Sequence, residues 1–204
     1  MTDLRARRPG VRLSAAERRA RLLEAASRAF ADGSYRGTTT SEIARAAGVT
    51  EPVLYRHFRS KRELFLACLA ESWSRIRALW ERALEAEPEP REWVPALARA
   101  FRASEERVVV HALWVQALAE ASEDRAIRSY MQQHMREVHG FVAEAIRRSQ
   151  AAGGIPRDRD AAAEAWIFLA VGFLLAVSTW LGGLIEEDVP SIVASRRRWL
   201  VESD

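Results

Sequence analysis

The sequence of 204 residues predicts an all-α protein with two helical parts. Apolar residues recur at helical spacing along most of the chain, and no segment alternates apolar and polar residues over the length of a useful strand. Ser14, Thr39 and Ser60 each precede a glutamate by three positions, which is the pattern of a capping box at the start of a helix. Short connections between the predicted helices favour antiparallel packing.

The first two predicted helices begin at two of these boxes. Ser14 and Glu17 begin a helix that runs to about Ala31, with an apolar stripe along one side. Thr39 and Glu42 begin a second, shorter helix, in which alanines allow another helix to cross closely. Each box satisfies backbone N–H groups that a helix leaves free at its first turn.

A glycine turn and a third helix follow. Gly48 supplies a left-handed residue at which a helix ends. Thr50 caps the next helix, and Pro52 lies in its first turn, where a backbone N–H has no helical partner. Leu54 and Phe58 are placed to face a core. Two short helices joined in this way form a helix-turn-helix, a motif that places its second helix in the major groove of DNA.

The charge of the chain is divided unevenly. Residues 1–62 contain 14 Arg and Lys against 6 Asp and Glu, a net charge of +8, while residues 63–204 carry a net charge of −5. A basic segment alone is often only a solvated surface. Because this one contains the helix-turn-helix, we interpret it as a nucleic-acid-binding module joined to a separate acidic domain.

A longer set of ordered positions carries a family resemblance. These positions are Ala25, Ala26, Phe30, Thr38, Thr39, Ile43, Ala44, Ala47, Gly48, Val49, Leu54, Tyr55, His57, Phe58, Ser60 and Lys61. Through them the chain resembles the tetracycline-repressor (TetR) family of transcriptional regulators over about residues 14–66, and beyond them by helix count and length. It departs from the family pattern at Ser34, where members usually have glycine, and at Pro52, where many have glycine.

The resemblance implies two domains and a set of DNA contacts. An N-terminal arm and the helix-turn-helix domain would occupy residues 1–62, and a helical ligand-binding and dimerisation domain residues 63–204. Arg56 would either pair with guanine, worth about 1–3 kcal/mol of discrimination, or clamp a phosphate. Lys61, the only lysine among 31 basic residues, matches a family lysine that resembles a phosphate-binding charge. The candidate DNA-contacting residues are Thr39, Thr40, Thr50, Glu51, Pro52, Val53, Tyr55, Arg56, His57 and Lys61.

The remaining helices are predicted from periodicity and from Gly and Pro positions. Ser60 and Glu63 form a third capping box, at the start of a long helix that ends near Glu85. Because this helix joins both domains, we expect it to transmit effector binding. Further helices are predicted over about 92–103, 105–121, 123–151, 159–181 and 189–201.

Residues 165–185 carry no charge. Their length qualifies them as a transmembrane candidate, but a helix buried in a core and a subunit interface has the same composition. The preceding amphipathic helices need a packing partner, which favours the second interpretation. The resemblance implies that residues 123–151 and 159–181 form a four-helix bundle with a second copy. The candidate interface residues are His139, Phe141, Trp166, Leu169, Phe173, Val177 and Trp180.

All seven tryptophans lie outside the first 62 residues. Most tryptophans at helical spacing fill a core, and several together can also line a cavity for a small apolar or aromatic effector. His111 is either a hydrogen-bonded core histidine or a polar anchor in such a cavity. The candidate cavity residues are Trp73, Trp80, Phe101, His111, Trp114, Met131 and Met135.

Motifs for metal, cofactor or catalytic chemistry are weak. His134 and His139 lie five positions apart and therefore diverge around a helix, so we predict no metal site there. Cys68 is the only cysteine, which excludes an intrachain disulfide. No catalytic triad order, glycine-rich phosphate loop or paired-carboxylate motif stands out, so neither a cofactor nor an enzymatic activity is predicted.

These observations predict a cytoplasmic, homodimeric regulator that binds double-stranded operator DNA, most often a repressor released by a small effector. Three alternatives stay open from the sequence. The first is a regulator of the same fold whose body binds a protein partner in place of a small molecule. The other two are an all-helical enzyme and a protein anchored in a membrane through residues 165–185.

Overall fold

The computed structural model describes residues 14–201, so the predicted N-terminal arm over residues 1–13 lies outside the described part. The described residues form nine α-helices and one short 3₁₀-helix, without a strand among them. The elements are α1 (Ala15–Asp32), α2 (Thr40–Ala46), α3 (Glu51–His57), α4 (Lys61–Ala86), η1 (Pro90–Glu92), α5 (Trp93–Ala103), α6 (Glu106–Glu120), α7 (Arg125–Ala151), α8 (Ala161–Trp180) and α9 (Val189–Val201). The all-α fold class predicted from the sequence is confirmed.

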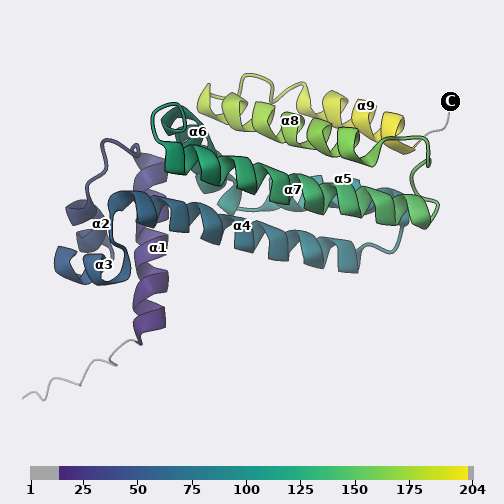
Figure 1. Cartoon of the computed structure of the whole chain (residues 1–204). Helices are drawn as coiled ribbons and strands as arrows, with labels where there is room; N and C mark the ends of the chain where they lie inside the picture. The colour runs from purple at the N-terminus through teal and green to yellow at the C-terminus, as the bar shows by residue number, and fades with distance from the viewer. Residues whose placement is uncertain (1–13, 202–204) are drawn as a thin grey trace, which may run out of the picture.

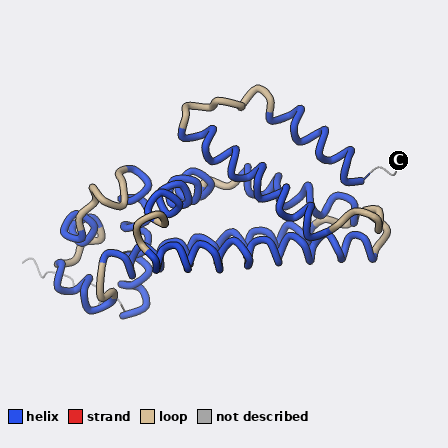
Figure 2. The backbone as a smooth tube through the Cα atoms, turned by 45° about the horizontal axis from the view of Figure 1, so that its top comes forward, coloured by secondary structure: helices blue, strands red, loops and turns tan. Residues whose placement is uncertain are grey.

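The molecule is elongated, with the helix-turn-helix at one end (Figure 1). We call α1–α3 the head and α4–α9 the body. The long helix α4 leads away from the head and runs beside α7, while α8 and α9 cover the opposite side of the body (Figures 1 and 2). The helix expected to connect the two parts is therefore α4.

The helix starts agree with the predicted caps in part. Full capping boxes are present at Ser14 and at Thr39. Thr50 occupies the N-cap of α3, but its side chain makes no capping hydrogen bond, which corrects the prediction. At α4 only half of the box forms, because Ser60 accepts a hydrogen bond from the N–H of Glu63 while the Glu63 carboxylate accepts from the N–H of Arg59.

A single apolar core holds the head together and continues into the body. Leu22 and Phe30 of α1, Ile43 of α2 and Leu54 of α3 are all fully buried in it. Phe65 of α4 packs edge-on against Phe30, with ring centroids 5.1 Å apart. Four residues of α6 and α7 complete this core, namely Leu113, Ala117, Ile127 and Met131. Burial of this shared surface fixes the head against the body.

The turn of the helix-turn-helix has the predicted geometry. Gly48 has φ +70°, in the left-handed region that other residues rarely adopt. The N–H of Gly48 donates to the carbonyl oxygen of Arg45, and the N–H of Val49 to that of Ala44, so the end of α2 is closed by backbone hydrogen bonds. This turn places α3 on the outer side of the head.

Helix α8, Ala161–Trp180, is the one helix in residues 14–201 long and apolar enough to cross a membrane, and a third of it is buried within the chain. It packs against α6 and α7. Several large apolar side chains on its other faces are exposed, among them Trp166, Phe173, Leu174 and Trp180. The helix thus has one face in the core and another that none of the described residues covers.

Candidate functional site

The outer face of α3 presents a mixed polar surface. Tyr55 is 47% exposed, and Arg56 and Pro52 are also exposed, as is Thr50 at the start of the helix. The candidates Glu51, Val53 and His57 are half-buried. Because Leu54 is fully buried beneath them, α3 is held by its inner side while its outer side faces solvent.

A hydrogen-bonded cluster connects α2 to α3. The Thr40 hydroxyl donates to a carboxylate oxygen of Glu51, and its oxygen lies 3.1 Å from the Tyr55 hydroxyl. Thr40 is only 8% exposed. Its hydroxyl is thus engaged within the head, where it orients Glu51 and Tyr55, and a DNA contact by Thr40 itself stays a prediction.

Thr39 is exposed at the start of α2, and its hydroxyl is engaged with Glu42. Hydrogen bonds to Glu42 from the backbone N–H and the hydroxyl of Thr39 hold the pKa of that carboxyl below its usual value. The carboxylate therefore stays charged at the helix N-terminus, where the helix dipole favours a negative charge.

Lys61 has contacts that the sequence did not indicate. Its Nζ donates to the carbonyl oxygens of Arg36, at 3.2 Å, and of Thr38, at 3.1 Å. The ammonium also lies 5.0 Å from the centroid of the Tyr35 ring. The side chain thus closes the loop between α1 and α2, a structural role in addition to the phosphate contact that its position suggests.

Polar contacts connect the loop between α1 and α2, and the start of α4, to the segment that joins α6 and α7. The Arg36 guanidinium forms ion pairs with Glu120 and Glu123, and the hydrogen bonds that it donates to both carboxylates raise its pKa. Arg62 pairs with Asp124, the N-cap of α7, at 3.1 Å. These pairs join residues 62 to 87 positions apart, and no local motif in the sequence signals them.

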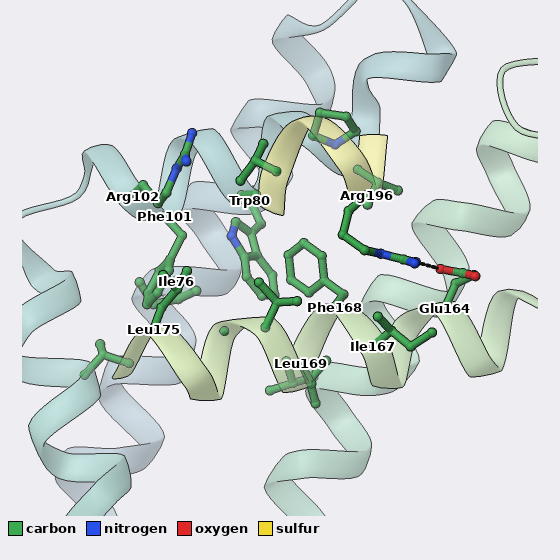
Figure 3. A pocket seen from close by; sticks show the side chains of 18 of the residues that line it. Ile76, Trp80, Phe101, Arg102, Glu164, Ile167, Phe168, Leu169, Leu175 and Arg196 are labelled. Carbon is green, nitrogen blue, oxygen red and sulfur yellow. Dashed lines mark hydrogen bonds and ion pairs between the residues drawn. The ribbon is translucent and has the colours of Figure 1, made fainter. Parts of the chain in front are cut away.

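An apolar cavity of about 160 Å³ lies inside the body. Five of the seven candidate cavity residues line it, namely Trp73, Trp80, Phe101, His111 and Trp114. Side chains of α5 and α8 form further walls, and Figure 3 shows Trp80 and Phe168 beside each other above α8. A dry cavity of ~150 Å³ is large enough to bind benzene.

The two methionines in the candidate set lie elsewhere. Met131 is buried in the core shared with the head, and Met135 packs against the body core. Both are on α7, which faces the cavity at His134 and Val138. The prediction for Met131 and Met135 is therefore wrong, although both share a face of α7 with His134 and Val138, because their side chains fill the two cores next to the cavity.

His134 is one of the cavity residues that sequence reasoning missed. It is buried between Trp73, Trp114 and Tyr130, with ring centroids 5.3–5.9 Å from its own. Burial lowers its pKa to about 4 and that of His111 to about 4. His139 instead faces away, where it stacks on Trp166 and bonds to the carbonyl of Ala162. The spacing of five residues, which argued against a metal site, places His134 at the cavity and His139 against Trp166.

A polar cluster closes one side of the cavity. Glu164 of α8 is buried and forms an ion pair with Arg196 of α9, which Figure 3 shows reaching across to it. The same carboxylate accepts a hydrogen bond of 2.9 Å from the Trp199 indole. Arg197 pairs with Glu92 at the start of α5. These contacts fasten α9 over the cavity.

The candidate interface residues divide into two groups. Trp166, Phe173 and Trp180 are exposed, while His139 and Val177 are half-buried. Leu169 is 4% exposed and lines the cavity, and Phe141 packs against Trp73 and Trp80 in the core. Leu169 therefore points inward and is not available to a dimer interface, while Phe141 is half-buried and its assignment stays a prediction.

Comparisons with known proteins agree with this arrangement. The family model described as bacterial regulatory proteins, tetR family, matches residues 22–68. The activator FasR of Mycolicibacterium smegmatis is 43% identical over 94 residues, which are 46% of this chain and 43% of that protein. The regulator BetI of Rhizobium meliloti is 31% identical over 131 residues, 64% of each chain. The matched regions thus span less than two thirds of these relatives.

Solved structures share the fold along most of the chain. A TetR-family regulator from Rhodococcus sp. superposes with a TM-score of 0.81 at 24% identity, covering 92% of this chain and all of that one. GusR of Salmonella enterica gives a TM-score of 0.76 at 21% identity, covering 94% and 98%. A regulator from Saccharomonospora viridis in complex with choline gives 0.72 at 23% identity, covering 82% and 87%.

The head, with its exposed second helix, and the all-helical body define a helix-turn-helix regulatory protein. The motif order, the family match and the shared architecture narrow this class to regulators of one kind. Residues 22–68 match the tetR family of bacterial regulatory proteins, and the chain as a whole is similar in fold to regulators of that family.

Proposed function

We propose that this chain regulates transcription in the cytoplasm, as a homodimer that binds operator DNA and is released by a small effector. The exposed outer face of α3 on an arginine-rich head carries the proposal. Its relatives include an activator, FasR, and a repressor, KstR2 of Mycolicibacterium smegmatis. We favour repression, in which effector binding lowers operator affinity.

In this proposal α3 enters the major groove. Arg56 is exposed and has no ion pair among the described residues, so it is free to pair with guanine or a phosphate. Tyr55 is held by Thr40 with its ring in solvent, which orients it for a phosphate or base edge. Phosphate contacts set the register, and base contacts specify the sequence.

The dimer would form through α8 and the adjacent face of α7. Trp166, Phe173 and Trp180 expose large apolar side chains on α8. Monomeric proteins seldom leave a large apolar patch exposed, so such a patch indicates an interface. Two heads related by a two-fold axis would reach half-sites ~34–36 Å apart on a near-palindromic operator. A second copy is therefore the occupant that α8 fits.

The cavity would hold the effector, and α6 would carry its effect to the head in addition to α4. His111 and Trp114 of α6 line the cavity, and Gln116 of the same helix bonds to the backbone of α1. Trp73 and Trp80 place α4 on the cavity as well. An effector that binds more tightly to one arrangement of these helices favours the head position that goes with it. The size of this shift is set by the difference in effector affinity between the two arrangements.

Binding to duplex DNA from around the chain's own gene tests the proposal. Fluorescence anisotropy would be measured against salt concentration and against unrelated competitor DNA. We expect tight, competitor-resistant binding by the wild type, and a loss of about tenfold or more in Arg56→Ala, the size of one good base or phosphate contact.

Arg82→Ala is the matched control, because Arg82 is an exposed arginine of α4 far along the body. We expect it to bind as the wild type does. Two outcomes would show that the head is only a charged surface. One is equal affinity of the wild type for operator and competitor DNA, and the other is equal operator affinity of Arg56→Ala and Arg82→Ala.

A further inference from the structure

Three side chains in the cavity wall bury polar atoms that no group in residues 14–201 satisfies. Trp80, His111 and His134 are each at least nine-tenths buried. The indole Nε1 of Trp80 and both ring nitrogens of each histidine have no hydrogen-bond partner among the described residues. An unsatisfied buried polar group is unfavourable by about 1–3 kcal/mol, so native proteins rarely keep several in one place.

These groups converge on the same aromatic space. The Trp73 ring lies 5.7 Å from both Trp80 and His134, each measured between centroids and each edge-on. Phe101 lies 5.3 Å from His111. Aromatic rings thus supply the walls, while one indole N–H and two imidazoles supply the polar points, as in sites for small organic ligands.

The charges around the cavity argue against a cationic ligand. Among the described residues that line it, Glu164 is the only acid, and Arg196 and Trp199 already occupy its oxygens. Three arginines line the rim, and Arg102 among them has no ion pair in residues 14–201. Because burial lowers the pKa of both histidines to about 4, they are neutral at pH 7 and each keeps one donor and one acceptor.

We propose that the effector is an uncharged aromatic or other apolar molecule bearing an oxygen acceptor, which takes the hydrogen bonds of Trp80, His111 and His134. This inference rests on the proposed effector cavity and adds the chemical class of the ligand. The indole Nε1 of Trp80 can only donate, so it requires an acceptor on the ligand. The neutral imidazoles adjust by tautomer to a carbonyl, ether or hydroxyl oxygen.

Three matched probes test the class by isothermal titration calorimetry on the full chain without DNA. Acetophenone presents a carbonyl oxygen, α-methylstyrene replaces that oxygen by CH₂, and phenyltrimethylammonium replaces the polar group by a cation. We expect acetophenone to bind at least about tenfold more tightly than α-methylstyrene, because the second leaves the buried donors unpaired. The cation should bind most weakly.

Variants then assign the preference to particular atoms. Trp80→Phe keeps a ring in place but removes the N–H, and we expect it to reduce the preference for acetophenone to about threefold or less. Trp93→Phe is the matched control, since Trp93 lies outside the cavity lining and its Nε1 bonds to the carbonyl of Glu87. His134→Phe provides a second reading if Trp80→Phe does not fold.

The outcomes separate this inference from the proposed function. Equal binding of acetophenone and α-methylstyrene would mean that water satisfies the buried groups, and tightest binding of the cation would indicate an aromatic cage for ammonium. Either result, or no binding of any probe, overturns the proposed ligand class. A failure of operator binding in the DNA experiment would leave the calorimetry unaffected, because that measurement contains no DNA.

Discussion

Gln116 of α6 donates a hydrogen bond from its side-chain Nε2 to the backbone carbonyl oxygen of Phe30, 2.6 Å away in the last turn of α1. Both residues are buried. Carbonyl groups in the last turn of a helix lack partners within the helix, so a side chain of the body satisfies the end of a head helix. Any displacement of α6 by a ligand next to His111 must therefore change or strain this contact.

Replacing Gln116 by leucine should destabilise the protein and weaken communication between cavity and head. The carbonyl of Phe30 loses its buried partner, which we expect to lower the free energy of unfolding by about 1–3 kcal/mol. Urea denaturation measures this change. Gln133→Leu is the control, because Gln133 is exposed on α7 and its side chain bonds, within the described residues, to Glu137 of the same helix. This variant should stay within about 0.5 kcal/mol of the wild type.

Stability should fall as the pH is lowered from about 6.5 towards 4.5. His111 and His134 have pKa values lowered to about 4 by burial, from an ordinary value of 6.5. In this window the unfolded chain binds protons at both imidazoles and the folded chain does not. The free energy of unfolding therefore decreases by at most about 1.4 kcal/mol per histidine for each pH unit below 6.5.

Single variants check the source of this slope. His111→Phe and His134→Phe should each remove about half of it, measured by urea denaturation at several pH values between 6.5 and 4.5. Glu17 and Glu42 have pKa values held below 4.5 by their capping hydrogen bonds, so their stabilisation is lost mainly below this window. An unchanged slope in both histidine variants would contradict the burial of neutral imidazoles.

Local patterns predicted the head well. The capping boxes at Ser14 and Thr39 and the positive φ of Gly48 depend on neighbouring residues, so a short stretch of sequence contains the information. Thr50 was predicted as a capping side chain and occupies the N-cap without that bond. The sequence thus predicted where α3 starts, but it did not predict the orientation of the Thr50 side chain.

Contacts between distant segments could not be predicted in the same way. Lys61 bonds to carbonyl groups 23 and 25 positions away, and Gln116 to one 86 positions away, so only the fold brings them together. In the cavity, five aromatic and histidine residues were found by composition. Met131 was misplaced and His134 missed, because spacing along one helix does not say which neighbour its faces meet.

Gly154 should tolerate no side chain, although it lies in a loop. A Cβ at this position would lie 2.3 Å from the backbone nitrogen of Arg91 and 2.5 Å from the carbonyl carbon of Pro90. Because backbone atoms cannot move aside easily, Gly154→Ala should lower the free energy of unfolding by about 1–3 kcal/mol. Thermal unfolding of the variant measures the loss.

Gly140→Ala is the matched control for that variant. Gly140 lies within α7, and a Cβ there meets no atom within 4 Å. Alanine in a helix interior is favoured over glycine by roughly 0.5–1 kcal/mol, so this variant should be as stable as the wild type or more so. Similar losses in both variants would contradict the close approach of Gly154 to Arg91.

A charge on the exposed face of α8 should dissociate the proposed dimer. Phe173 is 38% exposed in the middle of α8, so Phe173→Glu would bury a carboxylate without a partner between two copies. We expect the dimer dissociation constant, measured by analytical ultracentrifugation, to rise about 30-fold or more. Val108→Glu is the control, since Val108 is 52% exposed on α6, away from the proposed interface.

If both variants sediment as the wild type does, the exposed face of α8 has an occupant other than a second copy. If Phe173→Glu alone becomes monomeric and also loses operator affinity, dimerisation and DNA binding are linked, as two half-sites read by two heads require.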